Sequence, residues 1–191
     1  FISPEQIIPP KGIFDEMGNP VVWEACITMN NNWGYCETDK FFKSEEMLIK
    51  KLVECVSKGG NLLLNVGPDP KGNIPPESMH ILDGIGKWMS KNSKSIYGCG
   101  YGDIEKPEYG RITRNGKNIY YHVLDNPIGF IPLIGLKKKE IKKVRLLSTG
   151  TELKISDSWI CSNYPNIVFV SFGENPMMPD PTDTVIEVEL I

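Results

Sequence analysis

Residues 56–68 read VSKGGNLLLNVGP, and this stretch decides the fold of the first half of the chain. The Gly59-Gly60 pair is expected to end a helix, because glycine is the usual residue just past a helix C-terminus. The run Asn61–Val66 then has the length of a strand and is bounded by Gly60 and by Gly67-Pro68. A short, continuous apolar run of this kind is typical of a parallel strand covered on both faces.

The elements on either side complete a strand–helix–strand–helix order. Residues 21–29 (VVWEACITM) form an apolar run with a single charge, which indicates a largely buried strand. Ser44 is a good N-cap for a helix whose apolar positions recur at three-to-four spacing across residues 47–56. A second helix is expected from about Pro76 to Asn92. This order predicts parallel strands joined by right-handed crossovers.

Beyond residue 98 the pattern changes to that of short strands, and no helical stripe reaches three turns. Six strands are expected there: Gly110–Arg114, Lys117–Leu124, Val144–Ser148, Glu152–Ser156, Ile167–Phe172 and Thr184–Leu190. The Asn115-Gly116 pair between two of them predicts a two-residue hairpin. We therefore expect an α/β domain over residues 1–98 and an antiparallel β-sandwich domain over residues 99–191.

The first domain has too few strands to stand alone. A sheet of two parallel strands cannot cover the apolar faces of both strands and both helices. We interpret residues 1–98 as the last β/α units of an incomplete (β/α) TIM-like barrel, in a chain that starts at Phe1 as the downstream part of a longer protein. A length of 191 residues is itself too short for a complete (β/α)8 barrel, which takes about 250 residues.

Composition argues against several classes of function. Lys and Arg total 21 and Asp and Glu total 24, so a net charge of −3 gives no basic excess for nucleic acid or an anionic membrane. No apolar run approaches the ~20 residues of a membrane-spanning helix. The five cysteines include no C-x-x-C pair, and neither His80 nor His122 has a partner at metal-ligand spacing. We expect no metal and no cofactor.

Four segments resemble a known family and occur here in the family's order. They are Trp23-Glu24-Ala25-Cys26, Asn32-Trp33-Gly34-Tyr35, residues 56–68 and Ile96-Tyr97-Gly98. They resemble the downstream half of the family 29 glycoside hydrolases, the α-L-fucosidases, especially the bacterial members. The opening FISPEQIIPPKGI resembles the family segment that follows the strand bearing the nucleophile. The resemblance covers nearly the whole chain, more loosely across residues 100–165.

The resemblance implies a retaining exo-glycosidase that removes terminal α-L-fucose through a covalent glycosyl-enzyme intermediate. It implies an irregular (β/α) barrel followed by a C-terminal β-sandwich, and a fucosylated oligosaccharide or glycoconjugate as substrate. In the family, the aspartate nucleophile and the histidines that contact fucose lie upstream of the segment that begins here. Residues 1–191 alone are therefore expected to be inactive without the upstream barrel segment. A secreted or periplasmic location fits such a substrate, because fucosylated glycans lie outside cells.

Glu5 is the first candidate site residue. Retaining glycosidases use two carboxyl groups about 5–5.5 Å apart, one as nucleophile and one as general acid/base. Glu5, in Ser3-Pro4-Glu5-Gln6, matches the family position of the acid/base, and Pro4 stiffens the backbone before it. The alternative is that this segment only starts a helix, with Ser3 as N-cap and Pro4 as the first residue.

Glu24 and Trp33 are the other candidates. Glu24 lies on a buried-looking strand, where an ionised side chain is costly unless paired. It is a structural residue, an orienting partner of a catalytic group, or the runner-up catalytic carboxylate. Trp33 follows the same strand and matches a family aromatic that lines the fucose pocket, where the C6 methyl group needs an apolar wall. The alternative is a tryptophan that packs against Tyr35 within its loop.

Two other functions remain open from the sequence. One is a non-catalytic carbohydrate-binding β-sandwich module with an α/β spacer. It would need exposed aromatic side chains on one face of the sandwich, for which the chain offers Tyr109, Tyr120, Tyr121, Trp159 and Tyr164. The other is a barrel lyase or hydrolase that acts on another class of substrate.

Overall fold

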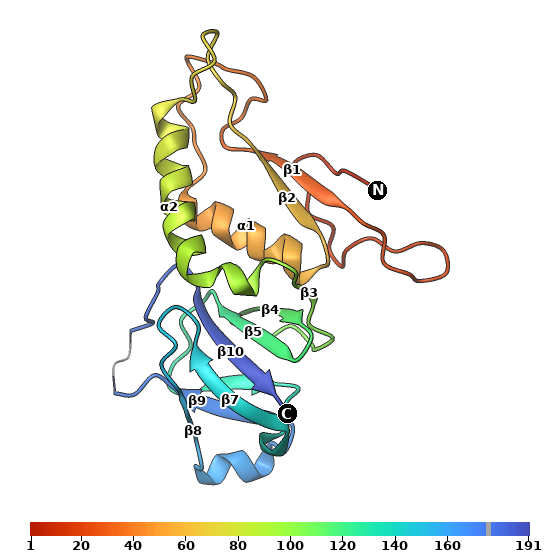
Figure 1. The fold of residues 1–191 in the computed structure, drawn as a ribbon, viewed down its shortest axis with the longest axis vertical. Helices are drawn as coiled ribbons and strands as arrows, with labels where there is room; N and C mark the ends of the chain where they lie inside the picture. Colours follow the sequence, from red (N-terminus) through yellow and green to blue (C-terminus); the bar gives the residue numbers. More distant parts are fainter. Residues whose placement is uncertain (175–176) are drawn as a thin grey trace. The chain divides into compact units, whose positions relative to one another are not determined.

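In a computed structural model that describes residues 1–174 and 177–191, the chain divides into two units, Phe1–Ser90 and Lys91–Ile191. The first unit is built from β1 (Glu24–Thr28), α1 (Glu45–Ser57), β2 (Asn61–Asn65) and most of α2 (Pro76–Asn92) (Figure 1). The predicted strand–helix–strand–helix order is confirmed, and β1 pairs with β2 in parallel. The unit boundary falls inside α2, while the domain division proposed at residue 98 stays a prediction.

A third parallel segment, residues 2–6, lies along the other edge of β1. Bridges join Ile2 to Trp23 and Glu5 to Cys26. The Cys26 N–H donates to the Pro4 carbonyl at 2.9 Å, and the Gln6 N–H donates to the Cys26 carbonyl at 2.8 Å. Pro4 has no N–H to donate, so it joins β1 through its carbonyl alone.

One face of this sheet packs against the helices. Trp23, Ala25 and Ile27 of the β1 region form a buried core with residues of α1 and α2, among them Leu48 and Ile81. The coverage of Asn61–Val66 on the second face stays a prediction, since it depends on strands outside these residues. The helices lie on one face only, and on the other face Leu63 is 44% exposed.

The helix ends follow the sequence closely. The Ser44 hydroxyl accepts a hydrogen bond from the Met47 N–H at 3.1 Å, which confirms the predicted N-cap. At the other end of α1, the Gly59 N–H donates to Val56 and the Gly60 N–H donates to Cys55, each at 2.9 Å. Gly59 has a φ of 73°, the left-handed conformation that glycine adopts without strain. These two bonds form a Schellman motif, which turns the chain from α1 into β2.

Gly60→Ala is expected to destabilise the protein. A Cβ atom at Gly60 would lie 2.3 Å from Cε2 and Cζ2 of the buried Trp23 ring, so either the ring or the backbone must shift. Overpacking of this kind typically costs about 1–3 kcal/mol in the free energy of unfolding, measurable as a lower urea midpoint. Gly86→Ala is the control: a Cβ there meets nothing within 4 Å, and alanine favours a helix interior. Equal midpoints for the two variants would contradict the predicted clash.

The second unit contains two antiparallel sheets. The larger has the order β3-β4-β5-β10-β7, and the smaller has the order β6-β9-β8 (Figure 1). Their strands are β3 (Gly100–Tyr101), β4 (Gly110–Asn115), β5 (Asn118–Val123), β6 (Ile131–Ile134), β7 (Ile141–Leu146), β8 (Lys154–Ile155), β9 (Ile167–Ser171) and β10 (Thr184–Leu190). Side chains from both sheets, such as Tyr121 and Ile186 from one and Leu133 and Val170 from the other, form a single core. Two sheets around one core are the arrangement of a β-sandwich.

Several details of this unit differ from the prediction, among them β3, which was not expected, and β7, which spans Ile141–Leu146 and not Val144–Ser148. Strand β6 is not expected from the sequence, because Pro132 lies within it, and among the described residues its one partner strand is β9. The expected strand Glu152–Ser156 is reduced to β8 and a bridge between Arg145 and Glu152. The hairpin is one residue later than expected, since Asn115 pairs with Asn118 and leaves Gly116 and Lys117 as the loop.

Short 3₁₀ segments are the only helical elements described after residue 92: η1 (Ser93–Ser95), η2 (Lys138–Glu140) and η3 (Trp159–Asn163). This agrees with the expected absence of long helices in that half. Among the described residues, no helix is both long and apolar enough to cross a membrane.

Candidate functional site

Glu5 lies in the extended segment beside β1, so the interpretation of Ser3-Pro4-Glu5 as a helix start is wrong. The side chain of Glu5 is exposed, and its bridge to Cys26 places the two residues on the same face of the sheet. Side chains alternate along a strand, so Glu24 shares that face. The structure thus brings both candidate carboxylates to the sheet face that carries no helix.

Ser3, two residues before Glu5, contacts Glu24. Its hydroxyl donates to Glu24 Oε1 at 3.4 Å and lies 3.0 Å from Cys26 Sγ. Glu24 therefore has a partner on the segment that carries Glu5, two residues before it. This contact fits an orienting role for Glu24, because it joins β1 to the segment of residues 2–6.

The backbone just after Glu5 is held in an uncommon conformation. Gln6 has a φ of 57°, a left-handed value that a residue with a side chain rarely adopts. Two hydrogen bonds keep it there: its N–H donates to the Cys26 carbonyl at 2.8 Å, and its Nε2 donates to Thr28 Oγ1 at 2.8 Å. The end of β1 therefore fixes the direction in which the chain leaves Glu5.

Lys43 also forms hydrogen bonds at this end of β1. Its Nζ donates to the Thr28 carbonyl at 2.7 Å and to the Asn30 carbonyl at 3.0 Å. Thr28 Oγ1 also donates to the Asn30 carbonyl, at 2.5 Å. Partial burial lowers the pKa of Lys43 from its ordinary value, and the nearby Asp39 charge opposes that change. Gln6, Thr28 and Lys43 form one hydrogen-bonded group at this strand end.

Trp33 lies in the loop that follows β1, and its side chain is 42% exposed. Asn65 at the end of β2 holds its backbone, because Asn65 Nδ2 donates to the Trp33 carbonyl at 2.7 Å. Gly67, with a φ of 53°, packs so closely that a Cβ atom would lie 3.3 Å from the Gly34 carbonyl oxygen. The loop is thus seated on the end of β2. Packing of Trp33 against Tyr35, which is itself 45% exposed, stays a prediction.

Asp39 organises this loop, although no sequence motif singles it out. Its side chain is 8% exposed. Its carboxylate accepts hydrogen bonds from the Asn31 N–H at 2.9 Å, from Asn32 Nδ2 at 2.7 Å and from the Phe41 N–H at 3.0 Å. The Phe41 N–H, helped by Asn31 and Asn32, holds the pKa of Asp39 below its usual value, although desolvation opposes this. The one sequence signal is the Asn30-Asn31-Asn32 run, whose amides need acceptors.

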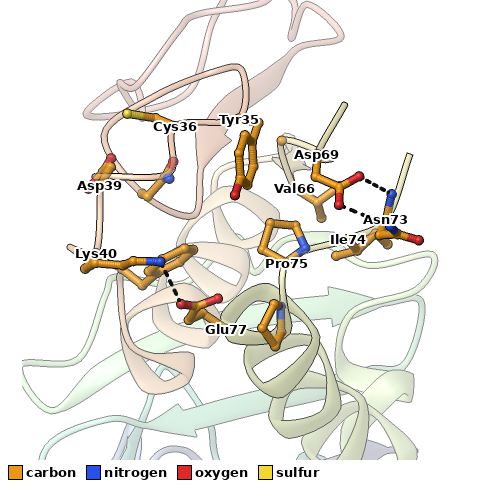
Figure 2. A pocket seen from close by; sticks show the side chains of 14 residues that line it. Tyr35, Cys36, Asp39, Lys40, Val66, Asp69, Asn73, Ile74, Pro75 and Glu77 are labelled. Atoms are coloured by element: carbon orange, nitrogen blue, oxygen red, sulfur yellow. Dashed lines mark hydrogen bonds and ion pairs between the residues drawn. The ribbon is translucent and has the colours of Figure 1, made fainter. Parts of the chain in front are cut away.

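A pocket of about 210 Å³ lies between the loop after β1 and the loop after β2 (Figure 2). The Tyr35 ring points into the space between Cys36 on one side and Val66 and Asp69 on the other. Lys40 and Glu77 form an ion pair of 3.4 Å at its border. Asp69 accepts from the Asn73 N–H at 2.8 Å, which closes the second loop on itself. Pockets for small ligands are usually about 300–1,000 Å³, so this space is small for a binding site by itself.

Comparisons with known proteins agree with these elements. Residues 3–94 match the family model described as "Alpha-L-fucosidase". The solved structure of α-L-fucosidase isoenzyme 1 from Paenibacillus thiaminolyticus superposes with a TM-score of 0.94 and 48% identity, over 99% of this chain and 44% of that chain. A GH29 α-L-fucosidase from Bacteroides thetaiotaomicron superposes with a TM-score of 0.82 and 28% identity, over 99% of this chain and 43% of that one.

The chain belongs to the α-L-fucosidase family. The tissue α-L-fucosidase of Bos taurus is 33% identical over 139 residues, which are 70% of this chain and 30% of the bovine protein. The Dictyostelium discoideum α-L-fucosidase is 39% identical over 111 residues, which are 55% of this chain and 24% of that protein. The chain therefore spans about a quarter to a third of these curated relatives. The resemblance inferred from the four sequence segments is confirmed.

The histidine of the second unit lies in a buried hydrogen-bonded group. His122 Nδ1 lies 2.7 Å from Asp183 Oδ2, and His122 Nε2 lies 3.1 Å from Thr113 Oγ1. The His122 and Asp183 side chains are fully buried. Within residues 1–174 and 177–191, no three His, Cys, Asp or Glu side chains gather as ligands for a metal ion.

The aromatic side chains of the β-sandwich divide into two groups. Tyr109, Tyr120 and Tyr121 are buried, and the hydroxyl groups of Tyr109 and Tyr121 donate to carbonyls of β6. Trp159 and Tyr164 are 80% and 46% exposed. Three of the five aromatics considered for a carbohydrate-binding face thus belong to the fold, which weakens that alternative.

Proposed function

We propose that this chain is the downstream part of a retaining exo-α-L-fucosidase that removes terminal α-L-fucose from fucosylated oligosaccharides or glycoconjugates. The observation that carries the proposal is the superposition on the Paenibacillus α-L-fucosidase, with a TM-score of 0.94 at 48% identity over 99% of this chain. Similarity that extends across both units favours a shared enzyme architecture over a binding module with a spacer.

The first unit supplies the last β/α units of a (β/α) barrel, and its helix-free sheet face is turned to the barrel interior. Polar or ionisable side chains on that face support this: Glu5, Glu24, Cys26 and Thr28 share it with Asn65. Leu63 lies on the same face, and a catalytic barrel collects its reacting groups at one end of its strands, where Glu5 and Thr28 lie close together. Residues 99–191 form the β-sandwich domain that follows.

Glu5 is the general acid/base, and the nucleophile comes from a preceding segment. In the first step, a carboxylate attacks C1 of fucose while Glu5 gives its proton to the departing glycosidic oxygen. In the second step, Glu5 takes a proton from water, the water oxygen bonds to C1, and the bond from C1 to the enzyme breaks. The Bacteroides structure supports this chemistry, since it is described as a covalent intermediate trapped with 2-fluoro-fucosyl fluoride in a Glu→Gln variant.

Glu24 and Trp33 support the same reaction. Glu24 orients the segment of residues 2–6 through Ser3, because Glu24 Oε1 accepts a hydrogen bond from the Ser3 hydroxyl at 3.4 Å. Trp33 gives the C6 methyl group of fucose an apolar wall, and its partly exposed side chain is accessible for that contact. The substrate is recognised without a cofactor.

Residues 1–191 alone are expected to show no turnover of an aryl α-L-fucoside, because an acid/base cannot form the glycosyl-enzyme bond without its nucleophile. The complete protein is expected to hydrolyse the same substrate. It should also gain the mass of one 2-fluoro-fucosyl group after incubation with 2-fluoro-fucosyl fluoride. Turnover by residues 1–191 above a buffer blank would refute the missing nucleophile, and a complete protein without turnover or adduct would refute the proposed activity.

A further inference from the structure

We propose that Asp39 is the positioning residue that holds Trp33 in place for fucose, and that it thereby sets the preference for a 6-deoxy sugar. The inference rests on the proposed function, because it assigns Trp33 to the sugar. Asp39 acts through the loop and makes no contact with the substrate itself.

The contacts of Asp39 bracket Trp33 in the chain. Oδ2 accepts from the Asn31 N–H at 2.9 Å and from Asn32 Nδ2 at 2.7 Å, just before Trp33. Oδ1 accepts from the Phe41 N–H at 3.0 Å, on the far side of the loop. A single carboxylate thus joins residues 31–32 to Phe41, and the loop between them contains Trp33.

Groups other than Asp39 also hold this part of the loop. Asn65 Nδ2 holds the Trp33 carbonyl at 2.7 Å, and Lys43 holds the Asn30 carbonyl at 3.0 Å. The backbone of Trp33 is therefore fixed while its ring stays partly exposed. This combination suits a ring that must meet a small methyl group at a defined place, since a displacement of about 1 Å can cost about 10²-fold in rate.

The bonding pattern calls for a carboxylate in particular. An ionised carboxylate only accepts, and every hydrogen bond that Asp39 receives comes from an N–H or NH₂ group. An asparagine at this position would turn an NH₂ group toward at least one of these donors. Asp39→Asn has nearly the same size, so it changes the hydrogen bonds and leaves the packing almost unaltered.

The chain offers a matched control in the next loop. Asp69 also closes a turn, and it accepts from the Lys71 N–H and the Asn73 N–H at 2.8 Å each. Hydrogen bonds from Asn73 lower the pKa of Asp69, as the Phe41 N–H does for Asp39. Both aspartates border the same pocket (Figure 2). Among the described residues, Asp39 accepts from Asn31, Asn32 and Phe41 in the loop that carries Trp33, whereas Asp69 accepts from Lys71 and Asn73 in its own loop. Asp69→Asn thus reports the cost of disturbing a similar turn nearby.

The test compares an aryl α-L-fucoside with the matching α-L-galactoside, which adds one hydroxyl at C6, in the complete enzyme. Asp39→Asn is expected to lower the ratio of the two kcat/KM values by about tenfold, within the range of one methyl-sized contact. The loss should fall on the fucoside, mainly through KM, while Asp69→Asn keeps the ratio. In protein labelled with 5-fluorotryptophan, the ¹⁹F signal of Trp33, assigned with Trp33→Phe, should shift in Asp39→Asn and stay in Asp69→Asn.

Asn32→Ala provides a milder variant should Asp39→Asn fold poorly. It removes one hydrogen bond to Asp39 and should move the ratio and the ¹⁹F signal in the same direction by less. Equal losses on both sugars, or an unmoved Trp33 signal, would overturn the positioning role of Asp39. An unchanged ratio in Trp33→Ala would refute the fucose contact of the proposed function instead, and would overturn the specificity part of this inference. The ¹⁹F shift then still decides whether Asp39 positions the ring.

Discussion

Replacing Glu5 by Gly in the complete enzyme is expected to slow hydrolysis of fucosides with leaving groups of high pKa by about 10²–10⁴-fold, the usual size of general acid/base catalysis. Such leaving groups depart only when they are protonated, and the variant has no proton donor. A leaving group of low pKa needs little protonation, so its first step should be nearly spared. The measurement is the rate of a series of aryl α-L-fucosides plotted against leaving-group pKa.

The second step provides an independent check on Glu5. Without a base to activate water, the intermediate should accumulate, and azide should rescue turnover because it attacks C1 without losing a proton. Glu24→Gln in parallel tests the other carboxylate on the same sheet face. If Glu5→Gly slows all leaving groups equally and azide has no effect, Glu5 is a structural residue. Azide rescue in Glu24→Gln would instead assign the acid/base to Glu24.

Trp33→Ala should cost the complete enzyme more on a fucoside than on the corresponding α-L-galactoside. Loss of the contact with the C6 methyl group is worth roughly 10–200-fold in kcat/KM, the usual scale for one methyl-sized group in an apolar pocket. The galactoside carries a hydroxyl at that carbon and gains less from an apolar wall. The kcat/KM of each aryl glycoside, measured separately by the rate of aryl release, gives the ratio.

Tyr97→Ala serves as the control for that experiment. Tyr97 is an exposed aromatic in the second unit, at 71% exposure, and its removal should leave the ratio unaltered. Equal losses on both sugars in Trp33→Ala would make Trp33 a structural loop residue, as in the alternative that packs it against Tyr35.

The elements that are predicted well from the sequence are those with strong capping signals at their ends. Ser44 and the Gly59-Gly60 pair define α1 almost to the residue, and the predicted bounds of the second helix, Pro76 and Asn92, are those observed. In these places capping and the helical period agree, so the local signal is sufficient. Strand β6 and the segment of residues 2–6 were missed because each contains a proline and pairs at an edge with a distant partner.

The candidate site was less accessible to sequence reasoning. Glu5 and Trp33 were named through the family resemblance, since an exposed glutamate and a loop tryptophan carry no pattern of their own. No sequence motif points to Asp39. Its burial follows from how the loop after β1 folds back on itself, and the Asn30-Asn31-Asn32 run is a weak signal for it because asparagines are common in any polar loop. Only the three-dimensional arrangement shows that Gln6 and Lys43 share Thr28 as a partner.

The role of Thr28 as a shared hydrogen-bond partner limits which substitutions the loop after β1 can accept. Thr28 ties the turn after Glu5 to the start of the Trp33 loop, because its hydroxyl accepts from Gln6 and donates to the Asn30 carbonyl. A loop exchanged from another family member with Thr28 left behind would disturb the geometry of both neighbours at once. A loop exchange in this region should therefore move Gln6, Thr28 and residues 30–43 together, because hydrogen bonds join them.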